Sequence, residues 1–252
     1  MLPFALNHMT APTLRYDSLA TLAGRCGCIG VELRNDLGRA LFDGADPADV
    51  REALEAAGIR LLALADIAVA CGAEAISLIP RNDGHRTESV QVRADLTTTL
   101  EALRPILRAR GLIGLIEPLG FATCGLRHKA DAVAVIDAIG AGDIFKLIHD
   151  TFHHHLAGGG AIFAAHTGLV HVSGVTDPSL KPAQMCDAHR GHVDADDNLG
   201  NLLQIKTLQV AGYAGPISVE AFSPDVHALT DPAAALSGSF NFITSHLLRN
   251  AA

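Results

Sequence analysis

The chain has 252 residues, of which 49% are hydrophobic, so it is long enough to bury one large core. Its formal net charge of -8 argues against a nucleic-acid partner, because phosphate binding needs a clustered basic surface. No apolar run approaches the roughly 20 residues that span a bilayer, and the N-terminus lacks a signal-peptide pattern. We therefore expect a soluble, cytoplasmic protein with no membrane partner.

Short apolar runs alternate with longer amphipathic stretches along the whole chain. The apolar runs predict eight buried parallel strands, over 4–9, 29–34, 59–64, 75–80, 112–118, 145–150, 169–174 and 216–222. The amphipathic stretches predict helices over 13–24, 47–58, 89–111, 129–140, 201–213 and 231–248. Eight strands that are each followed by a crossover predict an α/β fold, a single-domain (β/α)8 TIM barrel over residues 1–252. The alternative, an open doubly wound sheet, would carry a glycine-rich phosphate turn after its first strand, and FALNHMTAP has none.

The third predicted unit is anomalous. Only the ten residues ADIAVACGAE separate the third and fourth predicted strands. A parallel crossover usually needs about a dozen residues or more. We therefore expect a shortened third βα unit, in which the helix is clipped or residues are absent from this chain.

Polar side chains stand at the ends of four consecutive predicted strands. These are Glu117 on strand five, Asp150 on strand six, His171 on strand seven and Glu220 on strand eight. Active sites of TIM barrels lie at the C-terminal ends of the strands, so we expect these four side chains to converge at the barrel mouth. A buried charge is costly unless it is paired or coordinates a metal. The pattern therefore indicates a binding site more than four separate structural residues.

Three carboxylates and one imidazole are a set of hard oxygen and nitrogen ligands. Such a set suits one divalent metal ion, Mn, Mg, Co or Zn, with coordination positions left for water or substrate. A cation would also allow all three converging carboxylates to stay ionised. None of the five cysteines falls at a matching strand end, so a structural zinc site is not indicated.

The stretch KLIHDTFHHH admits three interpretations: a metal site, a general-base site or a solvated loop. We interpret Asp150 as a metal ligand and His153, three residues later, as a side chain that hydrogen-bonds a substrate oxygen. His149 precedes Asp150 and should point to the opposite face of the strand, toward the helical layer. The last two histidines of the run are expected to be solvated.

Several of these motifs carry a family likeness. The segments DTFH at 150–153, EP at 117–118 and SVEAF at 218–222 resemble the xylose isomerase-like superfamily of sugar isomerases and epimerases. GVELRND at 30–36 and DAHR at 187–190 also resemble that group. Within it the chain is most similar to 2-keto-myo-inositol isomerase (inosose isomerase), and next to the ketose 3-epimerases. The likeness runs through the whole chain.

The resemblance implies roles for particular residues. In that family the ends of strands five to eight hold one divalent metal, and the matching positions are the four residues described above. It implies that Glu117 and Glu220 are also the catalytic acid-base pair. It implies that His153 and Arg190 contact substrate, and Asn7, in the first predicted strand, is expected to be a further substrate-binding residue.

These roles suggest proton transfer next to a carbonyl, through a metal-bound enediolate of a keto-cyclitol or ketose. Return of the proton to the neighbouring carbon is isomerisation, and its return to the same carbon from the other face is epimerisation. The expected partner is a small-molecule sugar or cyclitol ketone, in carbohydrate metabolism such as inositol catabolism. Pairing of the chain into a homo-oligomer stays open.

Three alternatives remain. A ketose 3-epimerase would use the same site. An endonuclease IV-like phosphodiesterase would need several zinc ions and a basic groove, which the acidic composition disfavours. A sugar-binding barrel without catalysis would not need the pair Glu117 and Glu220.

Overall fold

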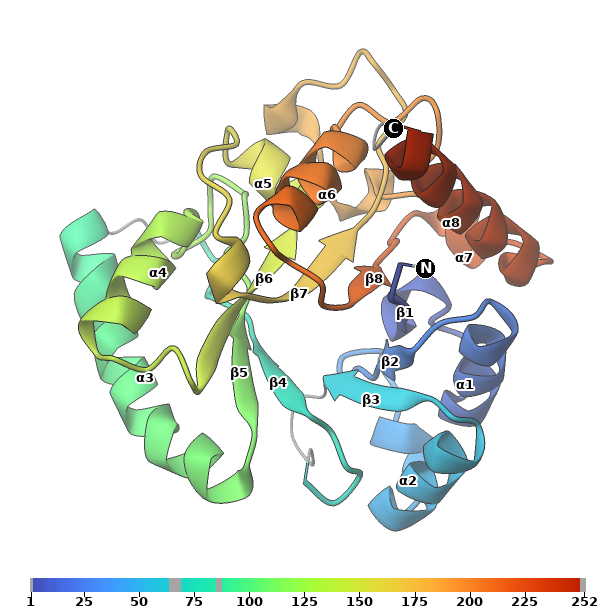
Figure 1. The fold of residues 1–252 in the computed structure, drawn as a ribbon, viewed down its shortest axis with the longest axis horizontal. Helices are drawn as coiled ribbons and strands as arrows, with labels where there is room; N and C mark the ends of the chain where they lie inside the picture. Colours follow the sequence, from blue (N-terminus) through green and yellow to red (C-terminus); the bar gives the residue numbers. More distant parts are fainter. Residues whose placement is uncertain (1, 64–68, 85–87, 250–252) are drawn as a thin grey trace.

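The strands form one parallel sheet that curves into a barrel (Figure 1). The structure is a computed structural model and describes residues 2–63, 69–84 and 88–249. The eight strands are β1 (Phe4–Asn7), β2 (Gly30–Glu32), β3 (Arg60–Ala63), β4 (Ala75–Leu78), β5 (Ile113–Ile116), β6 (Phe145–Asp150), β7 (Thr167–Val172) and β8 (Ile217–Val219).

The first and last strands of the chain lie side by side. The strand order is β3-β2-β1-β8-β7-β6-β5-β4, and Leu6 of β1 is in register with Val219 of β8. The helices surround the sheet (Figure 1). They are α1 (Tyr16–Arg25), α2 (Pro47–Ala56), α3 (Ser89–Arg110), α4 (Lys129–Ala138), α5 (Thr151–Leu156), α6 (Asn201–Val210), α7 (Pro224–His227) and α8 (Pro232–Arg249).

The predicted TIM barrel is confirmed, and every predicted strand and helix has its counterpart. Most of the strands are shorter than predicted. In β1, for example, the Asn7 side chain accepts a hydrogen bond from the Met9 amide at 3.0 Å and starts a 3-10 turn. The structure adds two short helices, α5 and α7, that the sequence pattern did not indicate.

Side chains alternate between the barrel interior and the helical layer. Leu115, Ile148 and Leu169 pack together in one buried cluster inside the barrel. Leu147, the neighbour of Ile148, instead belongs to the larger core between the strands and the helices. Successive residues of a strand point to opposite faces. This alternation sends Asp150 to the inside and His149 to the outside of the wall.

The third unit is shortened, as predicted. Residues 64–68 of the expected segment lie outside the described residues, and residues 69–74 contain a turn. Within the described chain, β3 and β4 are not paired with each other and stand at the two ends of the sheet. A groove of about 650 Å³, lined by apolar side chains of β4 and α3, lies behind β4.

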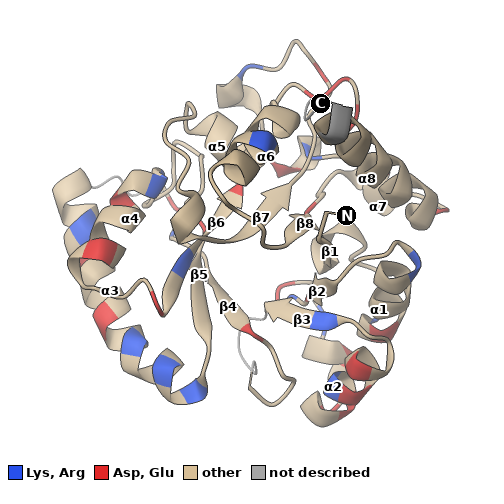
Figure 2. Ribbon diagram, in the orientation of Figure 1, with Lys and Arg blue, Asp and Glu red and all other residues tan. Residues whose placement is uncertain are grey.

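Charged side chains of both signs lie along α2 and α3 (Figure 2), as is typical of solvated helix faces. An ion pair between Arg93 and Asp131, at 2.7 Å, links α3 to α4. No helix in the described ranges has both the length and the apolar character needed to cross a membrane.

Candidate metal centre

The four predicted ligands converge. Their ligand atoms all lie within 4.8 Å of one another, and all four side chains are buried. Asp150 is in register with His171 on the neighbouring strand, so both stand at the same height of the barrel. The backbone N–H of Glu117 donates a hydrogen bond to the carbonyl of Leu78 in β4, at 3.2 Å. That of Glu220 donates to the carbonyl of Val172 in β7, at 3.0 Å. The sheet therefore fixes where each of these side chains enters the mouth.

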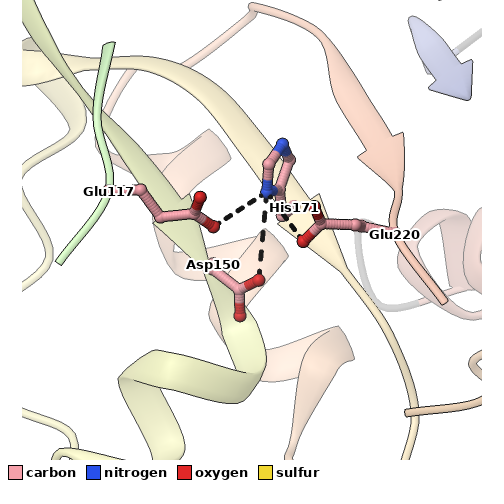
Figure 3. Close-up of side chains that lie close together, drawn as sticks. All are labelled: Glu117, Asp150, His171 and Glu220. Atoms are coloured by element: carbon pink, nitrogen blue, oxygen red, sulfur yellow. Dashed lines mark hydrogen bonds and ion pairs between the residues drawn. The ribbon is translucent and has the colours of Figure 1, made fainter. Parts of the chain in front are cut away.

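One ring nitrogen of His171 faces all three carboxylates (Figure 3). Its Nδ1 lies 3.0 Å from Glu117 Oε1, 3.2 Å from Glu220 Oε2 and 3.9 Å from Asp150 Oδ2. Burial by itself would lower the pKa of His171, but the surrounding carboxylates outweigh burial and raise that pKa well above its ordinary value. A positive charge is thus strongly stabilised at the centre of the cluster.

The two glutamates have opposite electrostatic environments. Burial raises the pKa of Glu117, and the nearby charge of Glu220 adds to this, while His171 opposes it. Burial would also raise the pKa of Glu220, but the positive charges of His171 and Arg190 outweigh it and hold that pKa well below its usual range. These side chains fit a divalent cation, because carboxylate and imidazole are its usual ligands and its two positive charges would offset most of the charge of the three carboxylates.

Sequence reasoning missed Glu32. Its carboxylate lies 3.1 and 3.2 Å from Nε2 of His171, the ring nitrogen that faces away from the cluster, and it accepts a hydrogen bond from Ser218 Oγ. Metal-binding histidines commonly donate their second N–H to a carboxylate, which fixes the tautomer and the ring orientation. The signal was present, because Glu32 ends the apolar run IGVE as the other four end theirs.

Arg190, predicted to contact substrate, lies within the cluster and is 1% exposed. Its Nη2 donates to Asp150 Oδ2 at 2.6 Å and to Glu220 Oε2 at 2.9 Å. Its guanidinium also lies over the rings of Phe152 and Phe222, 5.0 and 4.6 Å from their centroids. The structure thus brings Arg190 to the site, and its contact with substrate stays a prediction.

Arg34 was not predicted as a site residue. Its Nη1 donates to Glu220 Oε1 at 2.8 Å, while Nε and Nη2 donate to the two oxygens of Asp36 at 2.8 and 2.6 Å. Arg34 lines the open cleft of the mouth together with Asn7, the predicted substrate residue, and Glu117. Glu220 is therefore held between two arginines, one on each carboxylate oxygen.

His153 lies elsewhere. Its backbone N–H donates to Asp150 Oδ1 at 2.8 Å, and its ring packs edge-on against Phe121. The ring is buried, and it lines a second cavity beside Asp150 instead of the cleft of the mouth. Its contact with substrate stays a prediction. Gly120 allows the close approach of the preceding loop, because an added Cβ there would collide with the carbonyl of His153.

The other histidines of the run differ in how well their positions were predicted. His149 faces the helical layer as predicted, with Nδ1 2.7 Å from Lys129 Nζ and Nε2 2.9 Å from Gln204 Oε1. His154 was expected to be solvated but is half-buried, and its ring lies 4.9 Å from that of His149. Burial lowers the pKa of His154 to about 4. The short helix α5 turns this side chain back toward the strand.

Comparisons with known proteins agree with this fold. A family model described as "Xylose isomerase-like TIM barrel" matches residues 40–246. A search of curated proteins found no significant match.

Three solved structures have the same fold. A xylose isomerase domain containing protein from Salmonella typhimurium LT2 is 27% identical, with a TM-score of 0.85, and the match covers 98% of this chain and 97% of that one. The IOLI protein with a bound zinc atom is 17% identical, with a TM-score of 0.84 and coverage of 98% and 99%. D-allulose 3-epimerase from Methylomonas sp., in complex with D-allulose, is 16% identical, with a TM-score of 0.74 and coverage of 97% and 96%.

Proposed function

This chain belongs to the xylose isomerase-like TIM barrel family, and from that premise we propose that it is a divalent-metal-dependent isomerase of a keto-cyclitol or ketose. The proposed reaction resembles that of 2-keto-myo-inositol isomerase, which would place the protein in inositol catabolism. The observation that carries the proposal is the buried cluster of Glu117, Asp150, His171 and Glu220 at one end of the barrel.

The cluster would hold one metal ion, Mn, Mg, Co or Zn, through one atom of each of its four side chains. The ion would polarise a substrate carbonyl and stabilise the negative charge that develops on its oxygen. The zinc atom in the IOLI structure supports a metal in this fold. Glu32 supports it too, because it orients Nδ1 of His171 toward the carboxylates.

The protein's own groups would carry out the proton transfer. Glu117 and Glu220 approach His171 from opposite sides (Figure 3), so a substrate held between them would meet a carboxylate on each face. One glutamate removes the proton from the carbon next to the carbonyl, and the same glutamate or its partner returns a proton. Arg190 and Asn7 are the proposed substrate contacts beside this pair, and His153 is proposed to bind a substrate oxygen from the side of Asp150.

A second candidate is a ketose 3-epimerase with the same site. The likeness of the fold to a D-allulose 3-epimerase bound to its sugar supports it. The two candidates differ only in the carbon that receives the returned proton. Products from inososes and from ketoses, identified by NMR, distinguish them.

Metal dependence and proton transfer are tested together in D2O. Each candidate ketone is incubated with metal-loaded protein, and deuterium at the carbon next to the carbonyl is followed by NMR. We expect exchange that stops after treatment with EDTA and returns when a divalent metal is added back. Exchange by a sample that mass spectrometry shows to be metal-free would reject the mechanism, and binding without any exchange would favour a non-catalytic barrel.

A further inference from the structure

A second cavity, of about 170 Å³, lies beside the end of β6, among the start of α4, helix α5 and the loop that follows it. It shares no lining residue with the cleft at the barrel mouth. A cavity of about 10–15 Å³ is already large enough to hold one water molecule, so a ligand of several atoms fits in this one. We call it the Lys129 cavity; its lining includes Arg127, His128, Lys129, His153, His154 and Gly160.

Lys129 is a half-buried cation that forms no ion pair with an acidic residue in the described part of the chain. Its Nζ lies 2.7 Å from His149 Nδ1. The side-chain amide of Gln204 donates to the carbonyls of Thr151 and Leu199, so its oxygen is left to accept from His149 Nε2–H. That tautomer leaves His149 Nδ1 as a neutral acceptor for one hydrogen of the lysine.

None of the ion pairs among the described residues involves Lys129. A buried lysine is rare unless it is paired with an opposite charge. Burial accordingly lowers the pKa of Lys129 to about 7, although the charge of Asp150 opposes this. An anion in the cavity would supply the missing counter-charge.

Other groups on the lining are also donors. The Arg127 guanidinium is anchored by Nε to the carbonyl of Gly120 at 2.8 Å and by Nη2 to that of Leu156 at 2.6 Å. Its Nη1 makes no hydrogen bond to the described residues, so it remains available to a ligand. Three consecutive glycines, at 158–160, have positive φ, and the last two of them line the cavity.

His153 gives an independent indication of a ligand. The residue is 4% exposed, and its Nδ1 is buried with no hydrogen-bond partner among the described residues. A buried polar atom without a partner is costly. The acidic residue on the lining, Asp150, already accepts hydrogen bonds from the His153 amide and from Arg190, so it does not satisfy the cations of the cavity.

We propose that the Lys129 cavity binds a small oxoanion, a phosphate group that is either free or the ester of a small metabolite. Lysine and arginine are the usual phosphate ligands, and a phosphate offers acceptors to several converging donors at once. The first turn of α4, which begins at Lys129, adds backbone N–H groups at the positive end of a helix dipole. The cavity adjoins the candidate metal centre, because Asp150 lines both. Its proposed anion ligands Lys129 and Arg127 are not among the expected metal ligands, and the inference does not depend on the proposed isomerase activity.

Binding is measured by titration calorimetry at low ionic strength, with EDTA-treated full-length protein so that phosphate cannot bind a metal. Inorganic phosphate and glycerol phosphate are titrated separately into the unmodified protein, Lys129→Gln and Lys181→Gln. Lys181 is an exposed lysine and serves as the matched control. We expect one site with an affinity at least tenfold weaker in Lys129→Gln and unchanged in Lys181→Gln. The tighter of the two ligands tells whether the natural anion is free or esterified.

No saturable binding of either ligand, or equal binding by Lys129→Gln, would overturn the proposal. Because that variant could fail to fold, a second measurement uses the unmodified chain. Limiting pyridoxal 5′-phosphate condenses with a lysine amine, water leaves, and borohydride delivers hydride to reduce the imine to a stable secondary amine. Peptide mass spectrometry should find Lys129 labelled first, with inorganic phosphate slowing the reaction. If all the lysines of the chain were labelled at the same rate, and phosphate did not slow the reaction, the result would contradict the site.

Discussion

Glu32 and His171 form a buried pair in which the carboxylate lies 3.1 Å from the ring nitrogen that faces away from the candidate metal centre. Both side chains are almost wholly buried, and Ser218 Oγ holds the carboxylate from its other side. The pair leaves Nδ1 of His171 directed at the three remaining carboxylates (Figure 3). Glu32 is therefore a positioning residue for the expected metal ligand, and it never needs to touch the metal.

Glu32→Gln should weaken metal binding. The substitution keeps the size of the side chain but removes the charge that orients His171, and such changes cost roughly 10- to 100-fold in metal affinity. Titration calorimetry with Mn²⁺ and Zn²⁺ measures the effect. Glu101→Gln, on the exposed face of α3, is the matched control and should bind as the unmodified protein does. An unchanged dissociation constant in Glu32→Gln would show that the pair has no influence on the ion.

Glu220→Gln should preserve the fold and lose turnover. The amide cannot accept the proton from carbon, and general-base catalysis contributes roughly 100- to 10 000-fold. The rate of solvent deuterium exchange at the substrate carbon measures the loss, and circular dichroism checks the fold. If Glu220→Gln exchanged as fast as Glu101→Gln, Glu220 would have no part in proton transfer.

Arg190→Gln should destabilise the protein most strongly when metal is absent. Removing Arg190 leaves the buried Asp150 without its nearest cation and Glu220 with Arg34 as its one remaining arginine, and breaking such a buried pair costs about 3 kcal/mol or more. For a chain of this size that loss lowers the melting temperature by roughly 6–12 °C.

Differential scanning fluorimetry in EDTA measures this shift, and the same scan with bound metal should give a smaller one, since the ion supplies a positive charge. Arg110→Gln, at the exposed end of α3, is the control. An equal shift with and without metal would mean that the ion does not share the carboxylates with Arg190.

Stability should fall as the pH drops below about 6.5, in part because of His192. Burial lowers the pKa of His192 to about 4, and its Nε2 has no partner among the described residues. The folded state thus favours the neutral ring, whereas the unfolded chain takes up a proton near pH 6.5. The contribution is complete above that pH and is lost progressively as the pH falls toward 4.

Melting temperatures of the unmodified protein and His192→Gln, compared from pH 7.5 to pH 4.5, test this linkage. The loss on acidification should be smaller in His192→Gln than in the unmodified protein. Parallel slopes in the two proteins would remove His192 as a cause of acid sensitivity.

Much of the barrel and its polar mouth could be predicted from the order of residues alone. Apolar runs of strand length that alternate with amphipathic stretches are compatible with few folds other than parallel strands joined by helical crossovers. The two-residue period of a strand was enough to send Asp150 inward and His149 outward, and the structure agrees with both. The four strand-end residues were also predictable as a group, because parallel strands bring their C-terminal ends to one side.

Other features depended on the folded chain. Glu32 and His171 are separated by 139 positions, and Arg34 and Glu220 by 186, so no local pattern could pair them. The Lys129 cavity forms where α4, α5 and a glycine loop meet. That Lys129 lacks an ion-pair partner can be recognised only when its neighbours in the folded chain are known. The sequence by itself determined that the four residues at the ends of β5 to β8 face the mouth, because strand periodicity is local. Only the tertiary structure decided which of them touch, because those contacts depend on how distant strands and helices pack.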